Sequence, residues 1–239
     1  MTSTTEIRKD TRARANLEAI PRKSSRHGDP RYAWSDPAYT LMMQGIERRV
    51  LGELSRSGVS SLSGKRVLEI GCGSGHWLRE FVQWGADPRD VVGVDLLCER
   101  LRDAKGLSAA GLSVYCGDGA ALALRPGSFD LVLQFTAFTS ILDEDRRRQV
   151  ALEMLRVVKP DGLILWYDFH VQNPWNPNVR AIDEREIRDL FPDCVVKLRR
   201  MTLAPPLARI VASHSWLLCL LLERLSLLCT HYLGVIRRR

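Results

Sequence analysis

Nine consecutive residues set the architecture of this chain: Val67-Leu68-Glu69-Ile70-Gly71-Cys72-Gly73-Ser74-Gly75. The first four read as a buried strand, and an apolar helical pattern begins at Trp77, directly after three glycines at alternate positions. Glycine is needed where a chain turns sharply, or where a ligand comes too close to the backbone for a Cβ. The first N–H groups of the new helix would face such a ligand. The stretch therefore predicts a strand, a tight turn and a helix beside a ligand site.

The order of the acid and the glycines narrows the kind of ligand. A dinucleotide site has G-x-G-x-x-G, whereas this chain has E-x-G-x-G-x-G, which resembles motif I of the class I S-adenosylmethionine (SAM) dependent methyltransferases. The resemblance implies that Gly71, Cys72 and Gly73 pass beside the methionine part of the cofactor and that Glu69 helps to hold its amino group. A packing turn in another α/β domain is the alternative. The chain departs from the family pattern at His76, usually a small or polar position, which reads as a surface residue of the helix.

The net charge of +7 is concentrated at the two ends of the 239-residue chain. Residues 1–31 contain eight Lys or Arg and four acidic residues, and the chain ends in Arg237-Arg238-Arg239. The 205 residues between them carry 24 basic and 24 acidic residues. No basic groove for nucleic acid is therefore expected in the body of the protein. Hydrophobic residues make up 45% of the chain, which is enough for the core of one domain.

The six cysteines show no Cys-x-x-Cys pair and no histidine at metal-ligand spacing. We therefore expect neither a disulfide framework nor a metal site, and we expect the thiols to be reduced. Residues 1–31 contain no apolar run long enough for a signal peptide. These features together predict a cytoplasmic protein.

Two segments precede the glycine-rich stretch. Residues 1–31 predict a basic, disordered arm, and residues 32–60 predict a helical lid that opens the domain spanning 32–239. In the resembled family the equivalent segment often closes over cofactor and acceptor. Tyr32 and Trp34 are therefore expected to bind substrate; the alternative is that they only hold the helix against the domain.

Strands and helices alternate along the rest of the chain, which predicts an α/β fold with a doubly wound, seven-stranded, mainly parallel sheet. The resemblance adds a Rossmann-like order with an antiparallel last strand. Expected strands are 67–70, 91–95, 114–116, 129–135, 163–167, 194–203 and 230–236, and expected helices are 75–85, 98–109 and 143–158. Ligands of such sheets bind beyond the carboxyl ends of the strands, so the residues that end each strand are the candidates for function.

The second and third strands end in acidic residues. Asp95 closes the second strand, and the resemblance assigns it to the ribose hydroxyls of SAM; capping the next helix is the other role open to it. Asp118 resembles the family's acid for the adenine amino group, although Asp118-Gly119 is also a turn signal. Gly119 would allow close approach. Leu96 and Ala120 would form the apolar walls around the adenine.

The loop after the fourth strand lies between cofactor and acceptor in the resembled family. Gln134 and Phe135 are accordingly expected to contact the cofactor, with Phe135 as a wall. Thr136 is expected to bind the acceptor as a hydrogen-bond donor. Trp175, in the proline-containing loop after the fifth strand, is a further candidate for substrate binding.

Methyl transfer from a sulfonium is an in-line displacement, so the protein has to align the nucleophile, exclude water and remove a proton. No metal is required. If the acceptor is a hydroxyl, a base at the end of the fifth strand helps, and Asp168 and His170 are the candidates. They are two residues apart, so in an extended backbone they share a face. The alternative is a turn-capping aspartate and an exposed histidine.

Residues 204–229 predict an apolar helical insertion before the last strand. Charged residues interrupt it, so it falls short of the roughly 20 apolar residues of a membrane span. Its alternatives are a cap over a hydrophobic acceptor, a homodimer face, or a peripheral membrane contact made together with Arg237-Arg238-Arg239.

The predicted function is that of a SAM-dependent methyltransferase that O-methylates a small or glycosidic metabolite in bacterial secondary or envelope metabolism. From residue 32 onward the chain resembles a bacterial small-molecule subgroup of the family. C-methylation of a prenylated quinone-like ring and a SAM-binding module without turnover are the alternatives. The acceptor and the oligomeric state are left open.

Overall fold

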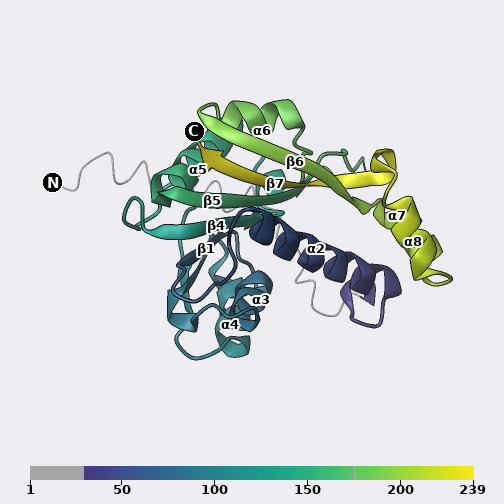
Figure 1. Cartoon of the computed structure of the whole chain (residues 1–239), viewed down its shortest axis with the longest axis horizontal. Helices are drawn as coiled ribbons and strands as arrows, with labels where there is room; N and C mark the ends of the chain where they lie inside the picture. The colour runs from purple at the N-terminus through teal and green to yellow at the C-terminus, as the bar shows by residue number, and fades with distance from the viewer. Residues whose placement is uncertain (1–29, 175) are drawn as a thin grey trace.

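The computed structural model describes residues 30–174 and 176–239, so the predicted basic arm lies almost wholly outside the described residues. One seven-stranded sheet runs through the molecule in the order β3-β2-β1-β4-β5-β7-β6 (Figure 1). Strands β1 to β5 are parallel, and β7 runs antiparallel between β5 and β6. The predicted doubly wound sheet with an antiparallel last strand is confirmed. The strands are β1 Val67–Ile70, β2 Val91–Asp95, β3 Ser113–Cys116, β4 Phe129–Phe135, β5 Val158–Phe169, β6 Cys194–Leu203 and β7 Cys229–Arg238.

Helices cover both faces of the sheet, and each face has its own apolar core. Side chains of α2, α3 and α4 pack on one face and those of α5 and α6 on the other. The helices are α2 Pro37–Arg56, α3 His76–Gln83, α4 Cys98–Leu107, α5 Glu144–Val157, α6 Glu184–Leu190, α7 Pro205–Ala212 and α8 Trp216–Leu222. Because successive strand residues point to opposite faces, this division decides which strand-end side chains can meet.

Helix α2 begins where the sequence supplies a cap. The Asp36 carboxylate accepts a hydrogen bond from the N–H of Tyr39 (2.8 Å), and Pro37 occupies the first turn. Both features are favourable at a helix N-terminus. The buried side of the helix, with Ile46 and Val50, packs on the core, so α2 is held along the sheet. Its role as a lid stays a prediction.

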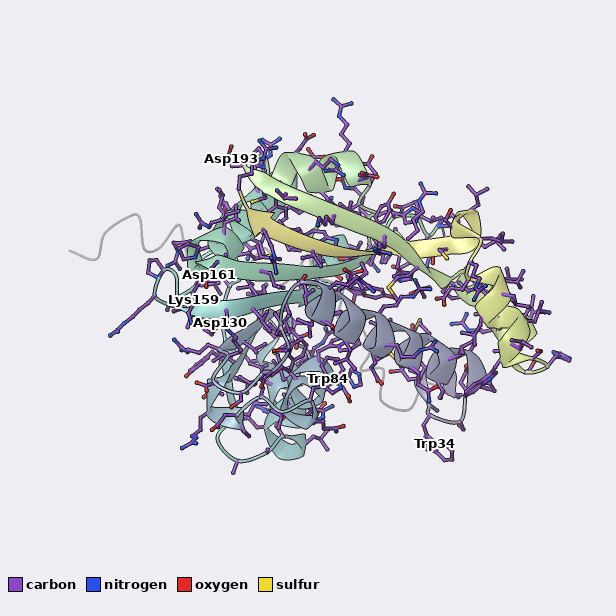
Figure 2. The ribbon with its side chains drawn as sticks, viewed as in Figure 1. Trp34, Trp84, Asp130, Lys159, Asp161 and Asp193 are labelled. Atoms are coloured by element: carbon purple, nitrogen blue, oxygen red, sulfur yellow. A yellow bond between two sulfur atoms is a disulfide. The ribbon has the colours of Figure 1, made fainter. Side chains whose placement is uncertain are left out.

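Opposite the carboxyl edge of the parallel strands, a cluster of charged residues lies at the amino edge. There the carboxylate of Asp130 pairs with Lys159 (2.8 Å) and Lys65 (3.5 Å), and Figure 2 shows Asp130, Lys159 and Asp161 together at that end. Residues 159–162, which precede the expected strand 163–167, lie inside β5, where the β4–β5 register shifts.

The apolar insertion forms two short helices, α7 and α8, at the carboxyl edge (Figure 1). None of the described helices has the length and apolarity that crossing a membrane requires. The predicted partnership of this insertion with Arg237-Arg238-Arg239 is not supported, because Arg238 pairs with Cys194 while Cys229 pairs with Leu203. The tail is therefore at the far end of β7, roughly 30 Å away at about 3.3 Å per residue.

Candidate functional site

A cavity of about 730 Å³ opens at the carboxyl edge of the sheet. The glycine turn and the end of β1 form its floor, and the ends of β4 and β5 form one wall. The opposite wall comes from residues 30–46, and α7 with the start of β7 closes the side. Segments distant in sequence thus converge where ligands of doubly wound sheets bind.

The glycine turn has the geometry that its sequence predicts. Gly71 has φ +77°, and a Cβ there would lie 2.6 Å from the Cβ of Ala137. Gly73 has φ +53°, lines the cavity and would meet nothing within 4 Å. The first glycine is therefore fixed by protein packing, whereas the second leaves open space beside the backbone that a ligand can use.

Glu69, the residue before the end of β1, carries a buried carboxylate that also lines the cavity. Burial raises its pKa to about 8; the negative charge of Asp95 adds to the rise, and Arg79 opposes it. Its Oε2 atom has no hydrogen-bond partner among the described residues. An unpaired buried carboxylate oxygen is costly, so this atom is suited to receive a cationic or donor group of a ligand.

Aromatic rings line one wall of the cavity. Trp77 stacks on Phe135 with centroids 4.4 Å apart, and Phe135 lies beside Tyr167 at 5.9 Å. Tyr167 in turn stacks on His231 at 4.9 Å and 8°. The hydroxyl of Tyr167 forms a 2.9 Å hydrogen bond with Oγ1 of Thr202. The wall is therefore apolar over most of its length and ends in an imidazole.

Thr136 lines the cavity at the end of β4 with φ +59°, a strained conformation for a branched residue. Its N–H donates to the carbonyl of Tyr167 (2.7 Å). The neighbouring Gln134 is fully buried on the other face, where its Oε1 accepts from the N–H of Ala137 (3.0 Å). The turn is thus built by Gln134 and presents Thr136 to the cavity.

The residues predicted for ribose and adenine lie outside the cavity lining. The Asp95 carboxylate accepts hydrogen bonds from the N–H groups of Gly73 and Leu97, both at 2.8 Å. Asp118 accepts from the N–H of Ala120 (2.9 Å) and pairs with Arg146 (2.7 Å), so the alternative turn role is present. The adenosine roles predicted for Asp95 and Asp118 stay proposals. So do those for Leu96, Gly119, Ala120 and Gln134.

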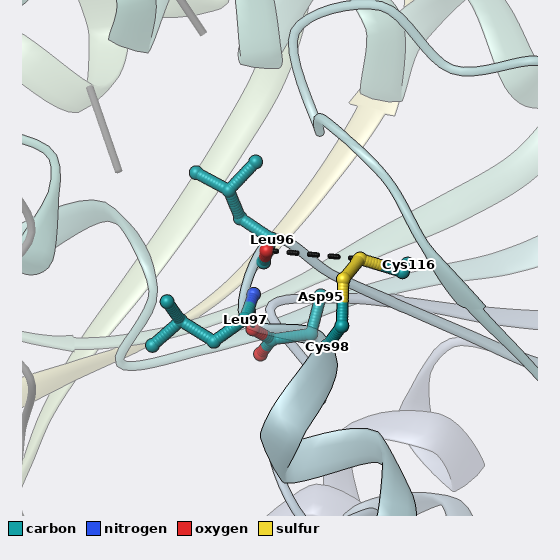
Figure 3. The surroundings of a disulfide bond; sticks show 5 residues. All are labelled: Asp95, Leu96, Leu97, Cys98 and Cys116. Carbon is teal, nitrogen blue, oxygen red and sulfur yellow. Dashed lines mark hydrogen bonds between the residues drawn. A yellow bond between two sulfur atoms is a disulfide. The ribbon is translucent and has the colours of Figure 1, made fainter. Parts of the chain in front are cut away.

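A disulfide joins Cys98 to Cys116 across this end of the site (Figure 3). The expectation of reduced thiols is therefore corrected for this pair; the remaining cysteines are free and buried. Parallel pairing places Cys116 opposite Asp95, and Cys98 follows three residues later, with its Cα 5.0 Å from that of Cys116. A spacing of 18 residues gives no local signal for such a pair.

The two predicted bases face away from the cavity. Asp168 is 1% exposed, and its carboxylate accepts from the Oγ1 and N–H of Thr139 at 2.6 and 3.1 Å. His170 stacks on Tyr232, and its Nε2 lies 3.1 Å from the carbonyl of Cys229. Burial lowers the pKa of His170, and Arg200 lowers it further. The two do share a face, but it is the face covered by α5 and α6.

The side chains that face the cavity from this region are Tyr167, Phe169 and His231. Tyr167 and Phe169 were within reach of sequence reasoning, since they alternate with Asp168 along one strand. His231 had no such signal, because it reaches the site through the antiparallel pairing of β7, with Phe169 opposite His231. Arg79, Met42 and Met43 also line the cavity without having been predicted.

Three of the four residues predicted to bind substrate line the cavity, and their role stays a prediction. Tyr32 lines the cavity and meets Tyr39 edge to face at 5.8 Å. Trp34 lies at the cavity mouth, where it is 88% exposed and projects from the body (Figure 2). Thr136 lines the cavity as well, whereas Trp175 falls outside the described residues.

Comparison with known proteins places the glycine turn in a family. Residues 67–162 match a family described as methyltransferase domain. The phthiotriol/phenolphthiotriol dimycocerosates methyltransferase 1 of Mycobacterium ulcerans is 31% identical over 140 residues, which are 53% of this chain and 48% of that protein. The ubiquinone biosynthesis O-methyltransferase of Ralstonia nicotianae is 34% identical over 113 residues, 46% and 45% of the two chains. This chain spans about half the length of each of these relatives in the match.

Solved structures share the fold over nearly the whole chain. Magnesium protoporphyrin IX methyltransferase from Synechocystis PCC 6803, with bound SAM, superposes with a TM-score of 0.61 at 15% identity, covering 94% of this chain and 96% of that one. The PH0226 protein from Pyrococcus horikoshii gives 0.62 at 15% identity, covering 84% and 91%. These likenesses concern the fold.

The residues at the cavity fit the cofactor of this family, SAM. The unpaired Oε2 of buried Glu69 suits the ammonium group of its methionine part. The open space beside Gly73 leaves room for that part to lie along the backbone. The stacked rings of Trp77 and Phe135 offer an apolar wall.

Proposed function

We propose that this chain, which belongs to the class I SAM-dependent methyltransferases, transfers a methyl group to an oxygen of a small or glycosidic acceptor. The observation that carries the proposal is the buried carboxylate of Glu69 with an unpaired oxygen at the floor of the cavity. SAM, when bound, supplies a methyl group on a sulfonium centre. The chain's own residues then have to hold the reactants in line and keep water out.

His231 takes the role that we first expected of His170. Its ring lines the cavity at the end of the aromatic wall and stacks on Tyr167. The Nδ1 atom lies 3.0 Å from Oγ1 of Thr230, which orients the ring. Imidazole is the side chain whose ordinary pKa best suits proton removal from a hydroxyl near neutral pH. We assign His231 as the general base and Tyr167 as the group that positions it.

Residues 30–46 form the wall through which the acceptor enters. Tyr32 and Tyr39 present rings there, and Met42 and Met43 present flexible apolar side chains. Such side chains adapt to irregular apolar shapes. The acceptor therefore has an apolar part beside the hydroxyl that is methylated.

A second candidate function is C-methylation of a prenylated quinone-like ring. It is favoured by the apolar surface of α7 and α8, where Ile210 and Leu217 are each 68% exposed and Leu227 is 87% exposed. This surface continues into the cavity wall at Pro205 and Ala208. It could cap a lipid-like acceptor, contact a membrane surface or form a homodimer face. A SAM-binding module without turnover is the non-enzymatic alternative.

Two experiments test the proposal. Isothermal titration measures the binding of SAM to the wild type and to Asp95→Ala, with Asp161→Ala, an exposed residue at the opposite edge, as the matched control. We expect weaker binding in Asp95→Ala alone. Incubation with methyl-labelled SAM and parallel panels of glycosides, phenols and prenylated quinols then identifies the acceptor class and the methylated atom. Lack of SAM binding by the wild type would rule the proposal out; binding without any labelled product would favour the non-enzymatic module.

A further inference from the structure

The departure at His76 leads to a group of residues to which the proposed methyl transfer assigns no role. His76 and Glu80 are four residues apart on α3, and Glu47 approaches them from α2. Residues at this spacing lie on one side of a helix. One ligand atom from each residue lies within 4.8 Å of those from the other two. Three potential metal ligands therefore converge where two helices meet.

The carboxylates of Glu47 and Glu80 lie close together in this group. Neither Glu47 nor Glu80 forms an ion pair or a side-chain hydrogen bond with another described residue. Both side chains are only partly exposed. Two partly buried carboxylates held close together repel each other, and a cation bound between them relieves this repulsion.

The distances suit one ion. A tetrahedral metal ion bound at about 2.0–2.2 Å by imidazole nitrogen and carboxylate oxygen keeps its ligand atoms roughly 3.3 to 3.6 Å apart. The three ligand atoms lie within 4.8 Å of one another. A small rotation of the side chains brings them to the spacing that the ion requires. One imidazole with two carboxylates is a ligand set for Zn²⁺ and similar divalent ions. We propose that Glu47, His76 and Glu80 bind one divalent transition-metal ion between α2 and α3.

The proposed ion lies between two helices that both contribute residues to the cavity. His76 lines the cavity at the start of the helix that follows the glycine turn. On the other side, α2 carries Tyr39, Met42 and Met43 into the same cavity. A bound ion ties these two walls together and restricts movement of α2. This role does not depend on the identity of the acceptor or on methyl transfer.

Metal binding is measured on the tag-free full chain after treatment with a chelator. Co²⁺ is titrated and followed by its visible absorption, and Zn²⁺ is then added to displace it. We expect one Co²⁺ per chain and full displacement by one Zn²⁺. Thermal unfolding is recorded with and without Zn²⁺, with an increase expected because a ligand that binds the folded chain stabilises it.

Variants locate the site. His76→Ala and Glu47→Gln should each lower the Co²⁺ affinity by at least about tenfold, since even changes around a metal's ligands cost 10- to 100-fold. His214→Ala and Glu99→Gln are the controls, as both residues are exposed and lie outside the group; they should bind Co²⁺ like the wild type. Absence of stoichiometric Co²⁺ binding by the wild type overturns the proposal. Equal binding by wild type and by Glu47→Gln also overturns it, and this change keeps the volume of the side chain.

Discussion

The two faces of the sheet carry very different chemistry at their carboxyl edge. On the face of α2 and α3, Glu69, Phe135, Tyr167 and His231 open into the cavity. One residue further along β1, β5 and β7, side chains point to the face of α5 and α6, where the carboxylate of Asp168 accepts hydrogen bonds from backbone and hydroxyl groups. Neighbours in sequence thus serve opposite purposes: one face binds ligands, and the other holds the loops that shape the binding face.

Replacing His231 or His170 with alanine tests this comparison and has the largest expected effect. We expect His231→Ala to lower kcat by about 10²- to 10⁴-fold, the range for loss of a general base, and His170→Ala to lower it less than about tenfold. The rate is followed with labelled SAM and the acceptor found in the panel experiment. The pH profile of His231→Ala should lose its acidic limb. Equal losses in the two variants would show that the faces are not functionally distinct.

Glu69 gives the next largest effect. Glu69→Gln should weaken SAM binding by roughly 10- to 150-fold, because a hydrogen bond to a charged group is worth about 1.5–3 kcal/mol. Burial raises the pKa of Glu69 to about 8, so protons compete with the cofactor's ammonium group below that pH. Wild-type affinity should therefore rise with pH by up to about tenfold per unit below pH 8. Titration calorimetry at several pH values checks both; the same pH slope in Glu69→Gln would contradict the assignment.

Asp168 should act on stability and not on cofactor binding. Asp168→Ala leaves the buried N–H groups of Thr139 and Phe169 without their acceptor. This should lower the free energy of unfolding by about 1–3 kcal/mol. Urea unfolding measures the change, and SAM titration of the folded variant is the control. A large loss of SAM affinity with unchanged stability would contradict this expectation and assign Asp168 a role in the active site.

Tyr167→Phe should give the smallest change. It removes the hydrogen bond between the tyrosine hydroxyl and Oγ1 of Thr202 but keeps the stacked ring. We expect a loss of about 0.5–1.5 kcal/mol in the free energy of unfolding, together with a modest fall in kcat as His231 loses positioning. Urea unfolding and steady-state rates are measured on the same preparation. A loss of kcat as large as that of His231→Ala would make Tyr167 itself a catalytic residue.

The sequence patterns predicted the strands and helices well because strand and helix formation depends on residues that are close together in the sequence. The alternation of apolar strands and amphipathic helices gave strands β2, β4 and β6 with the bounds that the structure has. The insertion was expected as one helical segment, but Ser215 caps a second helix through the N–H of Leu218 and divides it. The missed helix α6 is short and is buried mainly through Ile187 and Leu190.

The sequence by itself determined the sheet, the glycine turn and the acid before it. Each of these depends on residues close together in the sequence: the alternation of side chains along a strand, the glycines that allow a positive φ, and the acid within an apolar run. Only the tertiary structure decided which strand-end side chains meet. His231 reaches the cavity through antiparallel pairing with Phe169, and Cys98 reaches Cys116 through the β2–β3 register. Such contacts depend on the order of the strands and on the face of the sheet to which each side chain points. A shift of one residue in the strand register turns a side chain to the opposite face.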